Sequence, residues 1–165
     1  MTISKKLRVC STRNKKLRSA IGCALLIPLF CYAQQSKLTV KPPAQLTIQR
    51  GASATETLKV TVAPGLHVNN DKPRDEFLIP LKLTWDPGQL EIESIQFPKP
   101  EEIRVGGQAL TVFTGAFDIE TRFRAKLDTP PGEKTLHGKL RYQACNDQMC
   151  FRPATAEIEL PISVK

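Results

Sequence analysis

The sequence predicts an all-β protein, an immunoglobulin-like antiparallel β-sandwich of about seven to nine strands. Three observations lead to this fold class. Apolar and polar residues alternate along much of the chain, turn-forming residues separate these runs, and no long stretch repeats with the period of a helix. A jelly roll is the alternative architecture.

Each predicted strand is a run in which every second side chain faces the core. In chain order the runs are 46–48, 58–62, 79–85, 90–97, 110–113, 117–127, 136–144 and 156–164. Turn chemistry separates them at Pro64-Gly65, Asp86-Pro87-Gly88, Gly106-Gly107 and Pro130-Pro131-Gly132. Trp85 is predicted to lie in the core. In the run 136–144, Tyr142 takes the inward phase, which places Cys145 on the outward one.

The first 33 residues predict a secretory signal peptide. Seven basic residues lie within the first 18, and the apolar run Ile21–Tyr32 and the small residue Ala33 follow. The run is shorter than the roughly 20 residues that a helix needs to cross a bilayer. Residues 34–45 are then a loosely ordered lead-in and 46–165 the sandwich domain. We expect a periplasmic or secreted protein, or a membrane-tethered one if the leader stays uncleaved.

The charge distribution disfavours a nucleic-acid-binding protein. The formal net charge is +8, but from Gln34 onward 17 basic residues face 16 acidic ones. A protein that binds phosphates by neutralising them needs a basic surface, and the predicted mature domain is close to neutral.

Two of the five cysteines, Cys145 and Cys150, fall in the predicted mature domain. An even pair in an oxidising compartment indicates a disulfide. Partners so close in sequence form a local clasp across a turn, which contributes about 2 kcal/mol in the chain-entropy model. From the residues alone, a redox-active disulfide and a structural clasp both stay open.

A Cu(I)-handling protein is a third interpretation, because the Met149 thioether lies beside the two cysteines and His137 precedes them on the same predicted face. The cysteines and the scattered histidines match no zinc spacing. The chain carries no phosphate loop, no nucleophile elbow and no zinc-protease helix motif. We therefore predict no cofactor and no bound metal.

The segment Tyr142-Gln143-Ala144-Cys145 and the segment Cys150-Phe151-Arg152-Pro153 together resemble the active-site hairpin of the N-terminal periplasmic domain of the thiol:disulfide interchange protein DsbD. Residues 65–70 and 77–81 resemble the strand pair that opens this family. The likeness covers most of 38–165.

This resemblance implies an immunoglobulin-like domain with a reversible disulfide, in which Cys145 and Cys150 are the catalytic redox pair. It implies that the domain receives electrons from a thioredoxin-like domain or a membrane electron conduit. For this protein we expect that donor to be a separate polypeptide chain. The acceptors are extracytoplasmic disulfide isomerases or thiol proteins of cytochrome c maturation. An active protein would be a protein-disulfide reductase. The non-catalytic alternative is an immunoglobulin-like binding module.

The chain departs from the family pattern in two places. Familiar members have one more residue between the cysteines. They also cap the disulfide with an aromatic residue, and the matching stretch Glu101–Leu110 contains none. Either Ile103 or Val105 shields the sulfurs instead, or the site is more open.

Four polar residues near the motif have two interpretations each. His67 lies in the segment that faces the active hairpin in the family; it is most simply a surface histidine, and otherwise a local acid or base. Asp147 either favours the turn or disfavours a neighbouring thiolate. Arg141 and Arg152 are either solvated charges or lower the pKa of a thiol.

Overall fold

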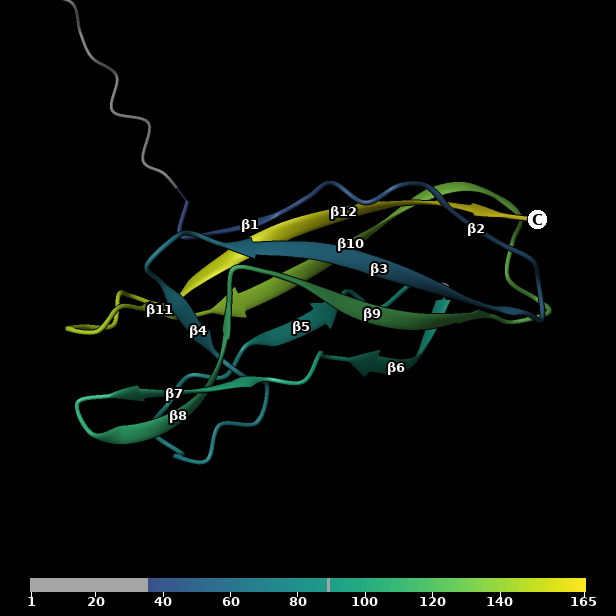
Figure 1. Cartoon of the computed structure of the whole chain (residues 1–165). Helices are drawn as coiled ribbons and strands as arrows, with labels where there is room; N and C mark the ends of the chain where they lie inside the picture. The colour runs from purple at the N-terminus through teal and green to yellow at the C-terminus, as the bar shows by residue number, and fades with distance from the viewer. Residues whose placement is uncertain (1–35, 89) are drawn as a thin grey trace, which may run out of the picture. The chain divides into compact units, whose positions relative to one another are not determined.

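The computed structural model describes residues 36–88 and 90–165, and all regular elements in this part of the chain are β-strands (Figure 1). The predicted signal peptide lies outside the described residues. Over the described ranges, no helix has the length and apolar character needed to cross a membrane. The twelve strands form three sheets of four strands each.

Two of these sheets enclose the main core. Their strand orders are β1-β3-β9-β6 and β2-β12-β10-β5, and every neighbouring pair is antiparallel except β2 and β12, which are parallel. The first sheet consists of β1 (Leu38–Val40), β3 (Ser53–Val62), β9 (Ala116–Ala125) and β6 (Leu90–Gln96). The second consists of β2 (Leu46–Ile48), β12 (Ala154–Val164), β10 (Gly132–Tyr142) and β5 (Lys82–Trp85).

The third sheet lies at one end of this sandwich in Figure 1, in the order β11-β4-β8-β7, and all its pairs are antiparallel. It consists of β11 (Ala144–Cys145), β4 (His67–Asn69), β8 (Gln108–Thr114) and β7 (Glu101–Val105). The chain enters it from β10 across Gln143 and leaves it for β9 across Gly115. The third sheet therefore continues the sandwich strands beyond the main core.

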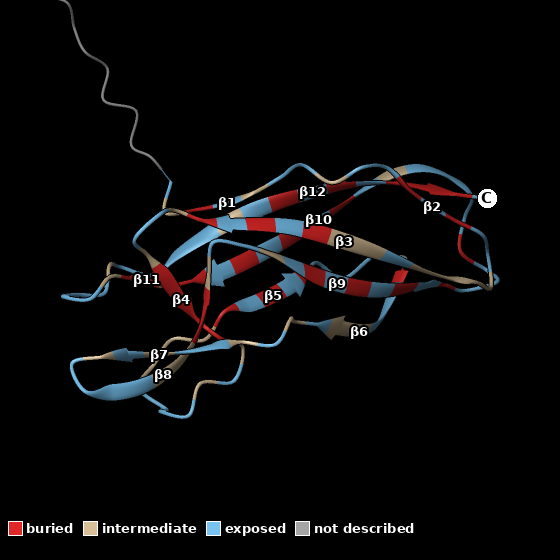
Figure 2. Cartoon of the chain, in the orientation of Figure 1, coloured by how far each residue is buried: buried red, intermediate tan, exposed pale blue. Residues whose placement is uncertain are grey.

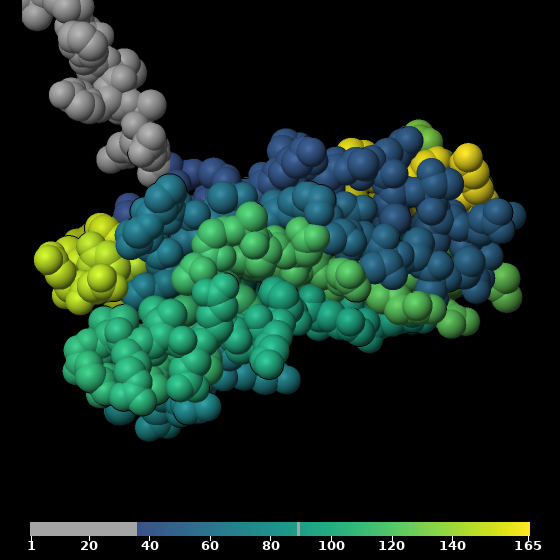
Figure 3. All heavy atoms as spheres, viewed as in Figure 1, coloured from purple at the N-terminus to yellow at the C-terminus, as the bar shows by residue number. Residues whose placement is uncertain are grey.

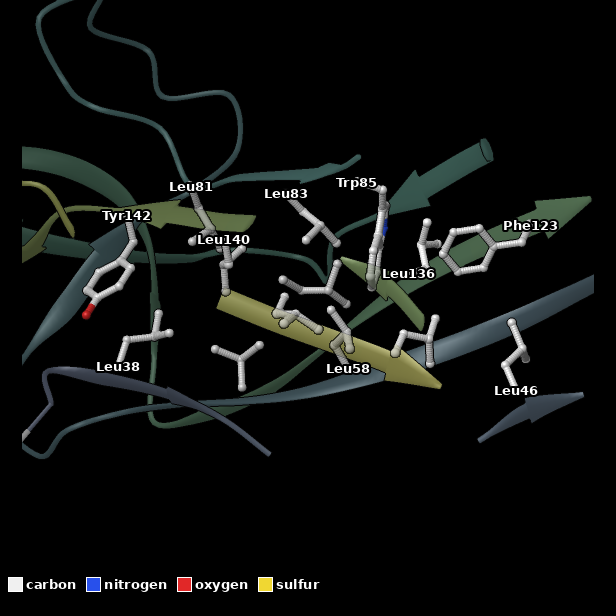
Figure 4. Packing of buried hydrophobic residues seen from close by; sticks show 14 of the residues in the cluster. Leu38, Leu46, Leu58, Leu81, Leu83, Trp85, Phe123, Leu136, Leu140 and Tyr142 are labelled. Carbon is white, nitrogen blue, oxygen red and sulfur yellow. The ribbon is translucent and has the colours of Figure 1, made fainter. Parts of the chain in front are cut away.

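The core alternates as the sequence predicts: buried and exposed residues take turns along β9, β10 and β12 (Figure 2). Trp85 packs edge-on against Phe123 with ring centroids 5.2 Å apart (Figure 4). Its Nε1–H donates a 3.2 Å hydrogen bond to Thr121 Oγ1. A Cβ at Gly138 would lie 2.7 Å from the Trp85 ring, so a glycine is required where β10 passes under the indole.

The fold class is confirmed, but the predicted number of strands is too low. The additional strands β1, β4, β7 and β11 have two to five residues each, too few to show a clear alternation. The strand β1 lies within residues 34–45, which were expected to be a loosely ordered lead-in. In this strand Leu38 is buried, and β1 pairs with β3. The run 117–127 was expected to end at an inward Leu127; instead β9 ends at Ala125 and Leu127 is 79% exposed.

Candidate functional site: a disulfide at the end of the sandwich

Cys145 and Cys150 are joined by a disulfide across a tight hairpin, with their Cα atoms 4.0 Å apart. The backbone pairs on both sides of them: Asn146 N–H donates to Met149 O at 3.0 Å, and Phe151 N–H donates to Ala144 O at 2.9 Å. The two cysteines thus face each other at a position without backbone hydrogen bonds, where antiparallel strands approach most closely.

Side chains fix this hairpin in addition to the disulfide. Asn146 Oδ1 accepts hydrogen bonds from the backbone N–H groups of Gln148 and Met149 at 2.9 and 2.8 Å. Asn146 therefore makes the turn, while Asp147 beside it is exposed. Gln143 Nε2 donates to Phe151 O at 2.9 Å and ties the two arms together. These contacts hold the arms in register without help from the sulfurs.

The two cysteines differ in accessibility. Cys145 is only 2% exposed, whereas Cys150 is exposed. The prediction that Cys145 faces outward is wrong for a specific reason. The chain leaves β10 at Tyr142 and joins β4 through β11, whose two residues are both buried, so Cys145 is covered as well as the inward Ala144. In Figure 3 the cysteine hairpin projects from the molecule close to the β7–β8 hairpin.

A cavity of about 290 Å³ lies against the disulfide. Beyond the hairpin itself, its walls come from β4, the 70–81 connection and the β7–β8 hairpin, as His67, Asn69, Leu78, Val105 and Leu110. Of the two residues expected to shield the sulfurs, Val105 lines the cavity and Ile103 does not. A larger depression of about 640 Å³, lined by Lys41, Lys59 and Lys99 among others, contains neither cysteine.

Turn geometry places Val105. The connection between β7 and β8 has two residues, Gly106 and Gly107, with φ of 56° and 84°. Positive φ at both positions is typical of the type I′ turn, which glycine adopts without a steric penalty. The Gly106-Gly107 turn predicted from the sequence therefore closes the hairpin that carries the aliphatic wall of the cavity.

The remaining wall of the cavity was not predicted from the sequence. Leu78 follows the charged segment 71–76, where no alternation marks an inward residue. Its segment is attached to β4 by Asn69, whose Nδ2 donates to Ile79 O at 3.0 Å. Neighbouring Phe77 is 86% exposed and Met149 is 56% exposed. Met149 lines the cavity, and Phe77 is next in the chain to the lining residue Leu78, so two exposed apolar side chains belong to the segments that form this site.

His67 is buried, so its interpretation as a surface histidine is wrong. It lies directly opposite Cys145 in the β4–β11 register and lines the same cavity. Burial lowers the pKa of the imidazole, and the Asp147 carboxylate opposes this shift. Arg141 and Arg152 are exposed, as expected for solvated charges. Over the described ranges, no three His, Cys, Asp or Glu residues gather as a metal site requires.

Comparisons with known proteins show the family of the chain. Residues 34–162 match the family model of the thiol:disulfide interchange protein DsbD, N-terminal. No curated protein sequence matches the chain. Among solved structures, it is similar to the N-terminal periplasmic domain of ScsB from Proteus mirabilis, at 16% identity and a TM-score of 0.51 over 68% of this chain and 42% of that one.

The Neisseria meningitidis DsbD N-terminal domain in the reduced form is a second similar structure, at 18% identity and a TM-score of 0.45. That match covers 67% of this chain and 79% of the other. The chain spans less than half of the ScsB structure, so that likeness concerns the fold alone. The family model, by contrast, matches nearly all of the described residues, and the chain belongs to the family of DsbD N-terminal domains.

Proposed function

We propose that this protein is an exported thiol–disulfide exchange protein in which the Cys145–Cys150 disulfide opens and closes during electron transfer. It passes reducing equivalents from a thioredoxin-like donor or membrane conduit to extracytoplasmic thiol proteins. Family membership supports exchange chemistry and thioredoxin-like partners in general. The observation that carries the proposal for this chain is the exposure of Cys150 in a disulfide whose other half is buried.

The unequal exposure supports one order of events. A thiolate attacks a disulfide through a mixed disulfide, so a partner needs access to one sulfur only. The donor thiolate attacks Cys150 Sγ, the Cys145–Cys150 bond breaks, and Cys145 leaves with the electron pair. A second donor thiol then attacks the mixed disulfide and releases the reduced domain. Delivery to an acceptor runs through the same bonds in reverse.

The reduction potential tests the proposal against a structural clasp. The mature domain is equilibrated in graded glutathione buffers, and free thiols are trapped by alkylation and counted by mass spectrometry. We expect a potential between about −150 and −260 mV, in the range of exchange proteins. A value below about −300 mV is that of a structural disulfide. Such a value would contradict the proposal.

Two exposed apolar side chains support docking of a folded protein partner: Met149, which lines the cavity, and Phe77, which precedes the cavity-lining Leu78 in the chain. Phe77→Ser and Met149→Ser are each expected to slow exchange with a thioredoxin-like protein about tenfold, since exposed anchors at interfaces contribute about 1 kcal/mol or more. Reduction by dithiothreitol should not change. Stopped-flow kinetics with both reductants measures this difference.

Leu127 provides the matched control, because it is similarly exposed in the β9–β10 connection, at the other end of the sandwich from β11 (Figure 1). Leu127→Ser should leave both rates unchanged. If it slows the protein partner as much as Phe77→Ser does, the effect is one of general surface hydrophobicity, and this docking surface is wrong.

A further inference from the structure

Resting on the proposed function, we propose that His67 is the acid–base residue of the exchange reaction, accepting the proton of the Cys145 thiol when the disulfide closes and returning it when the disulfide opens. The exchanging partner reaches Cys150, so the buried sulfur has no partner group to take its proton.

Register brings the two side chains together. Cys145 and His67 are direct partners in the antiparallel β11–β4 pair, so their side chains leave the sheet on the same face. Both line the cavity of about 290 Å³ against the disulfide. Cys145 is 2% exposed and His67 is 5% exposed. The imidazole is therefore the basic group that shares a sheltered space with the buried sulfur.

The imidazole is not committed to another contact. No other residue of the ranges 36–88 and 90–165 forms a hydrogen bond or ion pair with its ring, and the charge that acts on it is the Asp147 carboxylate. Burial lowers the pKa of His67, which keeps the ring neutral near neutral pH. A neutral imidazole with a free nitrogen is able to accept a proton.

The surroundings favour transient protonation of this ring. Apart from the two cysteines, Asp147 on the hairpin is the other titratable residue that lines the cavity with His67. On the other side of β4, β8 places Thr114 opposite His67, and the Thr114 hydroxyl donates to Glu101 of β7 at 2.8 Å. The 70–81 connection contributes apolar Leu78. The exposed Asp147 carboxylate thus stabilises the protonated imidazole by its charge, without a hydrogen bond to the ring.

The disulfide closes from the mixed disulfide with the acceptor. Cys150 is joined to an acceptor sulfur in the mixed disulfide. The Cys145 S–H proton passes to a His67 ring nitrogen, and the Cys145 sulfur attacks Cys150 Sγ. The bond from Cys150 to the acceptor breaks, and the acceptor leaves as a thiolate with both electrons. Thiols in apolar surroundings hold their proton tightly, which is why a base matters for this sulfur.

The experiment isolates that step with oxidised glutathione as the probe. Reduced protein is mixed with oxidised glutathione, the reaction is quenched in acid, and mass spectrometry separates the glutathionylated intermediate from the closed disulfide. In His67→Phe and in His67→Gln we expect the intermediate to accumulate, with closure slowed at least about tenfold at pH 7. General bases contribute about a hundredfold or more, but the fraction of Cys145 already present as thiolate reacts without a base and reduces the contribution of His67.

The pH profile separates proton transfer from a structural effect. In the unchanged protein, the rate of closure should rise with pH while His67 loses its proton and should then level off. The inflection should lie below about pH 6.5, because burial lowers the pKa of His67. Both His67 variants should lose this inflection. Asp147→Asn should move it to lower pH, because the carboxylate raises the pKa of His67, and the shift should vanish when combined with His67→Gln.

His137, the other histidine, is exposed on β10, and His137→Gln is the matched control. It should keep the unchanged rate and profile. Closure of both His67 variants at the unchanged rate, with the inflection intact, would overturn the role of His67. If the unchanged protein itself does not react with oxidised glutathione, the proposed function fails instead, so the two failures are distinguishable.

Discussion

Replacement of Cys150 by alanine is expected to abolish exchange with protein partners, whereas replacement of Cys145 by alanine is expected to trap a stable mixed disulfide. The reason is the unequal exposure of the two sulfurs: partners reach Cys150, and the buried Cys145 resolves the adduct from within. Without Cys145 the Cys150 thiolate still attacks the disulfide of an oxidised partner, but the domain has no second thiol to displace that partner.

The two variants are matched, because each loses the same cross-link, worth about 2 kcal/mol in the chain-entropy model. Adduct formation with an oxidised thioredoxin-like protein is followed on non-reducing gels and by mass spectrometry. Asn146, Gln143 and the flanking backbone hydrogen bonds hold the hairpin, so both variants should remain folded. Equal adduct formation by both variants would contradict the assignment of Cys150. Unfolding of both would favour a structural clasp.

Replacement of Phe123 by alanine is expected to cost about 3–5 kcal/mol of the free energy of unfolding. Phe123 has no exposed surface and packs edge-on against Trp85 between the two main sheets. Its removal leaves a cavity where the indole rests, and the hydrogen bond from Trp85 to Thr121 loses its packed surroundings.

Urea unfolding measures this cost, and Trp85 serves as the probe because it is the single tryptophan of the chain. Phe77→Ala is the matched control, since its ring is 86% exposed. It should change stability by less than about 0.5 kcal/mol. A loss below about 1 kcal/mol for Phe123→Ala would mean that this aromatic pair does not hold the two sheets together.

The fold class was predictable because long strands leave a pattern. The strands β9, β10 and β12 are ten or eleven residues long and alternate along most of that length, and burial on one face requires it. Short strands leave no such pattern. The β4 strand has three residues, all buried, and β11 has two, both buried. Covered on both faces, these strands show no alternation, so the third sheet was not expected.

The cysteine pair and its local turn were also set by the sequence, because contacts across a few residues depend on the chain between them. Asn146 and the backbone of 144–151 close the hairpin without distant help. Local sequence does not determine which of the two sulfurs is exposed to solvent. That exposure depends on β4, to which β11 is attached although the two are far apart along the chain.

The same distinction applies to His67. From the sequence it was one polar residue in a short segment, and its neighbours gave no measure of burial. Pairing of β4 between β8 and β11 covers the imidazole and sets it opposite Cys145. The sequence by itself determined the sandwich and the disulfide, since both follow from local periodicity and spacing. Tertiary structure alone decided which sulfur is exposed and which side chain lies opposite Cys145, because burial arises from strands that meet only once the chain has folded.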